Sequence, residues 1–177
     1  MSTIVWVGDP ANPTASAQLL NAEDELIWLY PPESQHGLTS TVVPHLLLAM
    51  PADSATLLGR GAIMDLLRQR EPEQLIIYLR HGSNQGNESD VEHRCRRLEE
   101  WIMGFIDVAE AALRLMHKRG SGGITLVLPY STLGDDATPV MNACDAFVRA
   151  WAGSVAARNA INNDVRVDLI GPSEDAA

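Results

Sequence analysis

Six short apolar runs, alternating with polar turns and helical patterns, restrict the fold of this sequence more than any other feature. The runs fall at residues 4–7, 26–30, 46–50, 75–79, 124–128 and 165–170. Runs of this length are typical of buried strands and are too short for buried helices. Their alternation with helices indicates a parallel sheet joined by right-handed crossovers. We therefore expect an α/β fold with a doubly wound parallel sheet of about six strands.

A brief helical segment at residues 14–20 and three longer helical patterns connect these runs. The three longer patterns cover residues 61–70, 91–118 and 139–160, with apolar side chains recurring every three or four positions. Gly120 is placed to end the second of them. No internal repeat, linker or low-complexity segment divides the chain, so we expect residues 1–177 to form a single domain.

Composition limits the kinds of partner. The net charge is −10, which argues against nucleic-acid and anionic-membrane binding, because both need clustered Lys and Arg. Two cysteines without a C-x-x-C spacing, Cys95 and Cys144, are expected to be reduced thiols. Residues 1–6 have no signal-peptide pattern, and no apolar stretch is long enough to span a bilayer. We expect a cytoplasmic protein.

Three stretches in the second half of the chain resemble the short-chain dehydrogenase/reductase family. Residues 111–124 (AALRLMHKRGSGGI) are similar to the family's helix, turn and strand before the catalytic serine. Residues 145–156 (DAFVRAWAGSVA) resemble the helix after the catalytic lysine. Residues 165–172 (VRVDLIGP) resemble the strand that usually reads I-R-V-N. The resemblance implies a Rossmann-like fold and, in intact members, NAD(P)-dependent oxidoreductase chemistry.

The family's phosphate loop, T-G-x-x-x-G-x-G, is degenerate in this chain. Its glycines let the backbone approach the cofactor's pyrophosphate. Of these glycines only Gly8 is kept, and Asn12 and Thr14 replace the other two. An aspartate and two prolines in the same loop disfavour binding further, because a carboxylate repels phosphate and proline lacks a backbone N–H. These residues are Asp9, Pro10 and Pro13.

Two further cofactor contacts of the family are missing. Tyr30 stands at the end of the second run, where the family places an acidic residue for the adenosine ribose or a basic one for NADP. The family's Asn-Asn-Ala-Gly after the fourth strand reads Leu79-Arg80-His81-Gly82. The resemblance therefore implies that this chain binds no cofactor.

The family's catalytic positions are also replaced. Its Tyr-x-x-x-Lys pairs a phenolic acid/base with a lysine that lowers the pKa of the phenol. The matching positions are Met141 and Asp145, and the helix asparagine falls at Trp101. Ser131 matches a serine of the family's motif, but it lacks the tyrosine on which the chemistry depends. The resemblance implies a non-catalytic pseudoenzyme.

Other chemistries remain open. Tyr130, next to Ser131, is a candidate for a displaced acid in a divergent enzyme, and His81 is a candidate catalytic histidine. His93 and Cys95 are an incomplete metal-ligand pair, so we expect no metal site. A stand-alone structural or binding module, similar to the structural half of a polyketide ketoreductase, is a second alternative.

The two long helices imply a partner. In the family their counterparts pack between subunits as a four-helix bundle, so we expect a hetero-oligomer with a catalytically active relative that holds NAD(P). The interface residues expected on this basis are Trp101, Phe105, Val108, Ala112, Met116, Cys144, Phe147, Val148, Trp151 and Val155.

The end of the chain bears on the expected assembly. After Gly171-Pro172 the sequence lacks the family's substrate lid and last strand, so we expect a Rossmann-like sheet that is truncated at its C-terminus. Without that strand this chain cannot form the family's other dimer contact, whereas an intact partner can. We therefore expect a heterotetramer with the active subunits at its centre. Heteromeric dehydrogenases with an inactive subunit are known in the family. One candidate complex oxidises 2-[hydroxy(phenyl)methyl]-succinyl-CoA in anaerobic toluene degradation.

Overall fold

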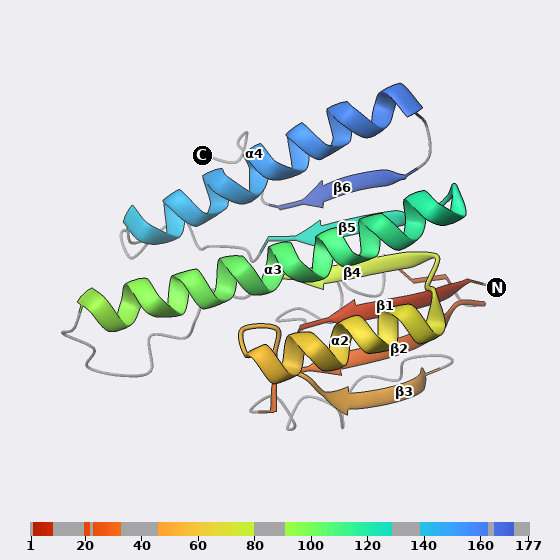
Figure 1. Cartoon of the computed structure of the whole chain (residues 1–177), viewed down its shortest axis with the longest axis horizontal. Coiled ribbons are helices and arrows are strands. Elements are labelled where there is room, and N and C mark those ends of the chain that lie inside the picture. The colour runs from red at the N-terminus through yellow and green to blue at the C-terminus, as the bar shows by residue number, and fades with distance from the viewer. Residues whose placement is uncertain are drawn as a thin grey trace.

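A six-stranded parallel sheet forms the centre of the molecule (Figure 1). The computed structural model describes residues 2–8, 20–21, 23–32, 46–79, 91–128, 139–162 and 165–171. The strands are β1 (Thr3–Val7), β2 (Glu25–Tyr30), β3 (Leu46–Pro51), β4 (Gln74–Tyr78), β5 (Gly123–Val127) and β6 (Arg166–Ile170). The described helices are α2 (Leu57–Arg70), α3 (Val91–Arg119) and α4 (Pro139–Asn162).

The strand order identifies the type of sheet. The strands lie in the order β3-β2-β1-β4-β5-β6, and all neighbouring pairs are parallel. The chain runs outward from β1 to β3, returns to the other side of β1 with β4, and continues to β6. The expected doubly wound, Rossmann-like sheet is confirmed. The direction in which the chain adds strands to the sheet reverses between β1 and β4, and ligands bind at this point in sheets of this kind.

The two faces of the sheet bury different sets of side chains. Alternate residues of a strand point to opposite faces, and both faces are apolar here, as buried parallel strands require. One face, which includes Val5, Ile27 and Leu75, packs with residues of α2, α3 and α4. These three helices lie together on that side (Figure 1). The opposite face holds a smaller cluster around Trp6 and Trp28.

Helix α2 begins four residues earlier than the sequence pattern predicts, at Leu57 instead of Gly61. The hydroxyl of Thr56 caps it by accepting a hydrogen bond from the Gly59 N–H at 3.0 Å. The apolar periodicity misses this turn because Leu57 and Leu58 are 78% and 88% exposed and so do not belong to the buried face.

The two long helices agree with their predicted positions. Helix α3 ends where Gly120 adopts φ +78°, and the Gly120 N–H donates to the Met116 carbonyl at 2.8 Å. This is the left-handed C-terminal cap that a glycine provides. Helix α4 extends two residues beyond the predicted end, to Asn162. Within the described part of the chain, no helix is long and apolar enough to cross a membrane.

Candidate functional site

Gly8, the first residue after β1, lies at the reversal point of the sheet. Its φ of +107° suits glycine and strains other residues. Its N–H donates to the Leu29 carbonyl at 2.8 Å, and its own carbonyl accepts from the Trp28 indole Nε1 at 2.8 Å. A Cβ on Gly8 would lie 2.6 Å from the Tyr78 carbonyl oxygen. The end of β1 is therefore tied to β2 and packed directly on β4.

Tyr30 contacts the core instead of the sheet edge. Its side chain is 8% exposed, and its ring meets that of Trp28 edge to face, with centroids 5.6 Å apart. Asn12, Thr14 and residues 80–82 lie outside the described residues. Of the cofactor-contact positions considered in the sequence, the structure thus describes the retained Gly8 and the replaced Tyr30 and Leu79, and all three make contacts within the chain.

The positions that the resemblance matches to the family's catalytic helix residues fall on α3 and α4. Trp101 lies on α3, is half-buried and packs against the core on the helix side of the sheet. Met141 and Asp145 lie one turn apart near the start of α4. The Asp145 side chain is half-buried, while that of Met141 is outside the described set. Tyr130 and Ser131 precede α4 and lie outside the described residues.

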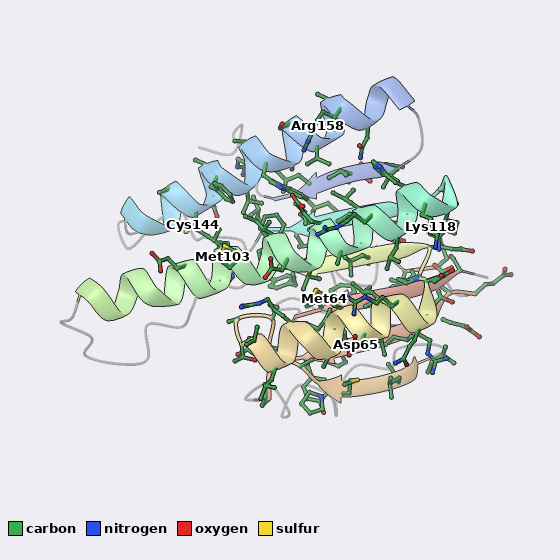
Figure 2. The ribbon with its side chains drawn as sticks, viewed as in Figure 1. Met64, Asp65, Met103, Lys118, Cys144 and Arg158 are labelled. Atoms are coloured by element: carbon green, nitrogen blue, oxygen red, sulfur yellow. The ribbon has the colours of Figure 1, made fainter. Side chains whose placement is uncertain are left out.

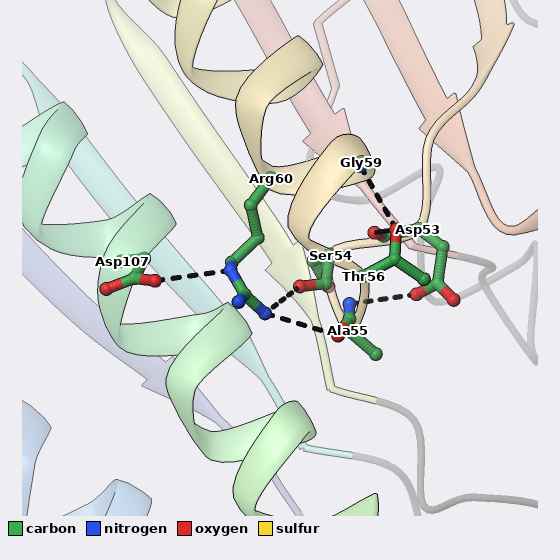
Figure 3. A network of polar contacts seen from close by, with 7 residues as sticks. All are labelled: Asp53, Ser54, Ala55, Thr56, Gly59, Arg60 and Asp107. Atoms are coloured by element: carbon green, nitrogen blue, oxygen red, sulfur yellow. Dashed lines mark hydrogen bonds and ion pairs between the residues drawn. The ribbon is translucent and has the colours of Figure 1, made fainter.

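A polar network joins the turn after β3 to α3, and the sequence pattern did not predict it (Figure 3). The Arg60 guanidinium donates through Nη1 to the carbonyls of Ser54 and Ala55, at 3.3 and 3.2 Å. Its Nε lies 3.2 Å from the Asp107 carboxylate on α3. Within the turn, the Asp53 carboxylate accepts from the Ala55 N–H at 2.9 Å. The polar contacts in Figure 3 therefore all join residues of this chain to one another.

Two glycines let this turn fit between α2 and α3. A Cβ on Gly59 would lie 1.9 Å from the Asp53 carbonyl oxygen, and one on Gly104 would lie 2.2 Å from the Ser54 carbonyl oxygen. Real Cβ atoms do not approach backbone so closely, so both positions require glycine. The sequence signals were the Asp53 and Thr56 capping residues and the mid-helix Gly104, whose close packing is visible only in three dimensions.

Most of the side chains expected at a partner interface lie inside this chain instead, which corrects that expectation. Those in the core are Phe105, Val108, Ala112, Met116, Cys144, Val148 and Val155. Trp101 and Trp151 are half-buried against the same core, and the Phe105 and Trp151 rings meet edge to face at 4.9 Å. Phe147, at 38% exposure, is the member of the set that faces outward. The physical reason is that α3 and α4 must first cover their own sheet.

The outward face of α4 is unusually apolar. We use this name for the exposed positions Ala143, Ala146, Phe147, Ala150, Gly153, Ser154 and Ala157. They recur at three- and four-residue spacing and so form one stripe along the helix. Among the exposed described positions of α4, Arg158 alone is charged (Figure 2).

Helix α3 provides the contrast. Its described exposed residues are Glu99, Met103, Glu110, Arg114, His117, Lys118 and Arg119. Charged groups therefore dominate the surface of α3, as is usual for a helix that faces water. The apolar surface of α4 is not a general property of this side of the molecule.

The Cys144 thiol lies on the inward side of α4. Its residue is 4% exposed. Burial, and secondarily the negative charge of Asp145, raise the pKa of this thiol above its ordinary value. A raised pKa removes the thiolate that nucleophilic or metal-binding chemistry needs.

The remaining candidates are placed only in part. His93 and Cys95 lie on α3, but their side chains are outside the described set, and His81 is outside it altogether. Among the side chains that are described, no three from His, Cys, Asp and Glu gather closely enough to hold a metal ion.

Comparisons of sequence find no relative: neither a protein-family model nor a curated protein matches the chain. Comparisons of structure do find proteins of similar fold. A short-chain dehydrogenase from Streptomyces avermitilis matches 98% of this chain with a TM-score of 0.70 and 19% identity, and the chain spans 66% of its length, just under two thirds.

Two further solved structures agree. The bulky-bulky ketone specific alcohol dehydrogenase from Comamonas testosteroni matches the whole chain with a TM-score of 0.76 and 14% identity over 76% of its own length. Acetoin dehydrogenase YohF from Salmonella typhimurium matches 98% of the chain with a TM-score of 0.71 and 15% identity over 77% of its own length. The chain therefore has the Rossmann-like fold of the short-chain dehydrogenases.

Proposed function

We propose that this chain is a cytoplasmic, non-catalytic subunit of a heteromeric NAD(P)-dependent alcohol dehydrogenase. In this proposal a catalytically active partner of the same fold holds the cofactor and performs the reaction. The fold supports a dehydrogenase relationship, and the residues argue against catalysis by this chain. Met141 and Asp145 replace an acid/base and a lysine, and neither supplies a proton-transfer pair of that kind.

The observation that carries the proposal is the outward face of α4. A helix on the surface of a monomer usually directs charged side chains to water, and a contiguous apolar surface marks a site of association. Here the exposed stripe runs from Ala143 to Ala157 without an acidic or basic group. Its solvation is unfavourable in an isolated chain, so a second protein surface is the expected cover.

The side-chain sizes on this face favour a helical partner. Ala146, Ala150 and Gly153 are small, and small residues allow another backbone to approach closely. Phe147 stands beside them as the single large projection. We propose that the corresponding helix of the active relative packs on this stripe.

The substrate belongs to the partner in this proposal. A hydroxyacyl-CoA such as 2-[hydroxy(phenyl)methyl]-succinyl-CoA is the finer candidate, through the resemblance to dehydrogenases that contain an inactive subunit. No described side chain of this chain selects that compound. The substrate is therefore identified by assaying the assembled complex and not by assaying this chain.

Calorimetric titration with NADH and NADPH tests the cofactor assignment. The isolated chain is expected to bind neither. After co-expression with a neighbouring gene product that keeps the glycine loop and the Tyr-x-x-x-Lys pair, one nucleotide is expected per pair of unlike chains. Saturable binding by the isolated chain would contradict the proposal.

Substitution on α4 tests the interface. Ala150→Arg places a charge in the centre of the outward face, and Leu58→Arg places the same charge at an exposed apolar position of α2 (88% exposed). We expect Ala150→Arg to abolish co-purification and Leu58→Arg to leave it intact. A stable homodimer that does not exchange with the active relative, or equal effects of the two variants, would refute the pairing.

A further inference from the structure

The turn after β1 is held by an unusual side-chain contact. The Trp28 indole reaches from β2 and donates to the Gly8 carbonyl at 2.8 Å. We infer that Trp28 closes the carboxyl end of β1 and makes Gly8, the glycine kept from the family's phosphate loop, an internal fastening that a phosphate-bearing nucleotide cannot engage. This inference rests on the proposed loss of cofactor binding and assigns that loss to a residue.

The backbone N–H and carbonyl of Gly8 both have hydrogen-bond partners within the chain. Phosphate groups bind glycine loops through free backbone N–H groups. The Gly8 N–H is already bonded to the Leu29 carbonyl at 2.8 Å. Its carbonyl is bonded to Trp28. The Gly8 N–H, the group from which a phosphate would accept, is therefore used within the chain, and the indole bond holds the Gly8 carbonyl in place.

Close packing around Gly8 and Trp28 opposes a rearrangement at this point of the chain. Gly8 packs so closely on β4 that a Cβ would lie 2.6 Å from the Tyr78 carbonyl oxygen. Trp28 is 6% exposed and its ring packs edge to face on Tyr30. A nucleotide that needed the turn to open would have to break the indole bond and displace a buried ring, so the contacts oppose opening from both neighbouring strands.

Comparison of Trp28 with Trp6 isolates the role of the indole N–H. Trp6 pairs directly with Trp28 across β1 and β2 and lies in the same buried cluster. Trp6 is 3% exposed, and its Nε1 has no hydrogen-bond partner among the residues that the structure describes. The two tryptophans therefore share a sheet face, a neighbourhood and a degree of burial, and they differ in the bond to Gly8. Trp6 is the matched control for Trp28.

Hydrogen exchange of the full-length chain, read by mass spectrometry on the peptide covering residues 3–8, tests the inference. Trp28→Phe keeps an aromatic ring and removes the donor, whereas Trp6→Phe makes the same change where no bond exists. We expect Trp28→Phe to accelerate exchange on the order of fivefold, the effect of losing one hydrogen bond. Trp6→Phe is expected to change it less than twofold by the same argument. Equal effects of the two variants overturn the inference.

A measurement on the unaltered protein covers the case in which a variant fails to fold. In a spectrum of the ¹⁵N-labelled indoles, the Trp28 proton is expected downfield of the Trp6 proton, because it is the hydrogen-bonded one. The reverse order overturns the inference.

Added NADH separates this inference from the proposed function. With millimolar NADH, unchanged exchange of residues 3–8 is the expected result. Slower exchange there means that the nucleotide engages the turn, and it overturns both ideas. Saturable NADH binding without a change at residues 3–8 contradicts the proposed function and leaves the fastening by Trp28 in place.

Discussion

The junction of α2 with α3 and the outward face of α4 differ in how their side chains are paired and packed. At the junction, Arg60 bonds to two carbonyls and pairs with Asp107, and Gly104 admits the turn at contact distance. On α4, a stripe of small and apolar side chains is exposed on the outward side of the helix. The difference teaches that polar, closely fitted contacts occur where the chain meets itself, while the exposed face of α4 lacks charged groups up to Ala157, which is why we propose it as an interface.

The largest expected effect separates two glycines that look alike in sequence. Gly104→Ala on α3 would bring a Cβ within 2.2 Å of the Ser54 carbonyl oxygen, whereas Gly153 on α4 has nothing within 4 Å of that position. We expect Gly104→Ala to lower the free energy of unfolding by about 3 kcal/mol. Gly153→Ala should raise it by about 0.5–1 kcal/mol, because alanine favours helix. Urea denaturation of the isolated chain measures both.

The two glycine variants bear directly on the comparison. A loss at both positions would mean that α4 is packed against something within the chain, and the contrast between the regions would disappear.

The next effect concerns the polar half of the junction. Arg60→Met keeps much of the side-chain volume but leaves the carbonyls of Ser54 and Ala55 without their donor. Its side chain is 14% exposed, so we expect a loss of about 2 kcal/mol. The control is Arg68→Met, which breaks an exposed ion pair with Asp65 and should cost less than about 0.5 kcal/mol. Similar losses in urea denaturation would show that the network adds nothing beyond a surface charge.

A smaller effect is expected for the contact between α3 and α4. The Phe105 and Trp151 rings meet edge to face at 4.9 Å. A double-mutant cycle with Phe105→Leu and Trp151→Leu should give a coupling free energy of about 1 kcal/mol. Additive losses in the cycle would mean that the two helices are stabilised independently by the sheet.

The smallest effect distinguishes the inward side of α4 from its outward face. Burial first, and the charge of Asp145 second, raise the pKa of the Cys144 thiol, so less thiolate is present at any pH below that pKa. In a Cys95→Ser background, we expect alkylation of Cys144 at pH 8 to be at least about tenfold slower than that of an exposed cysteine. Asp145→Asn should accelerate it slightly, because it removes a charge that disfavours the thiolate. Rates equal to those of a free thiol would place Cys144 at the surface.

The sequence pattern was sufficient for the sheet and insufficient for the contacts between layers. Strands such as β1 and β5 are buried on both faces and mostly apolar, so their runs are visible without knowledge of the partner strands. The start of α2 was missed because its first turn is exposed at Leu57 and Leu58. Periodicity locates an apolar face on a helix but does not say which molecule covers it, and this ambiguity led to Phe105 and Val148 being assigned to a partner.

For the candidate site, the sequence supports predictions only where a residue type of the resembled family is absent from the matching position. The replacement of the family's glycines and its Tyr-Lys pair can be read in one dimension, because each position has a defined chemical task. The bond from Trp28 to Gly8 joins residues 20 positions apart in the chain, and the Arg60–Asp107 pair joins two helices. No local pattern encodes these contacts, since they depend on strand register and helix placement.

The common direction of the three helices has an electrical consequence. α2, α3 and α4 all begin at the edge where the strands end (Figure 1), and each helix start carries about half a positive charge from its aligned peptide dipoles. The backbone alone thus maintains a positive potential along that edge, whatever side chains are present. Asp53, which accepts the Ala55 N–H just before α2, places a fixed negative charge in part of that potential. The field at this edge is therefore a property of the fold and does not depend on which side chains follow the strands.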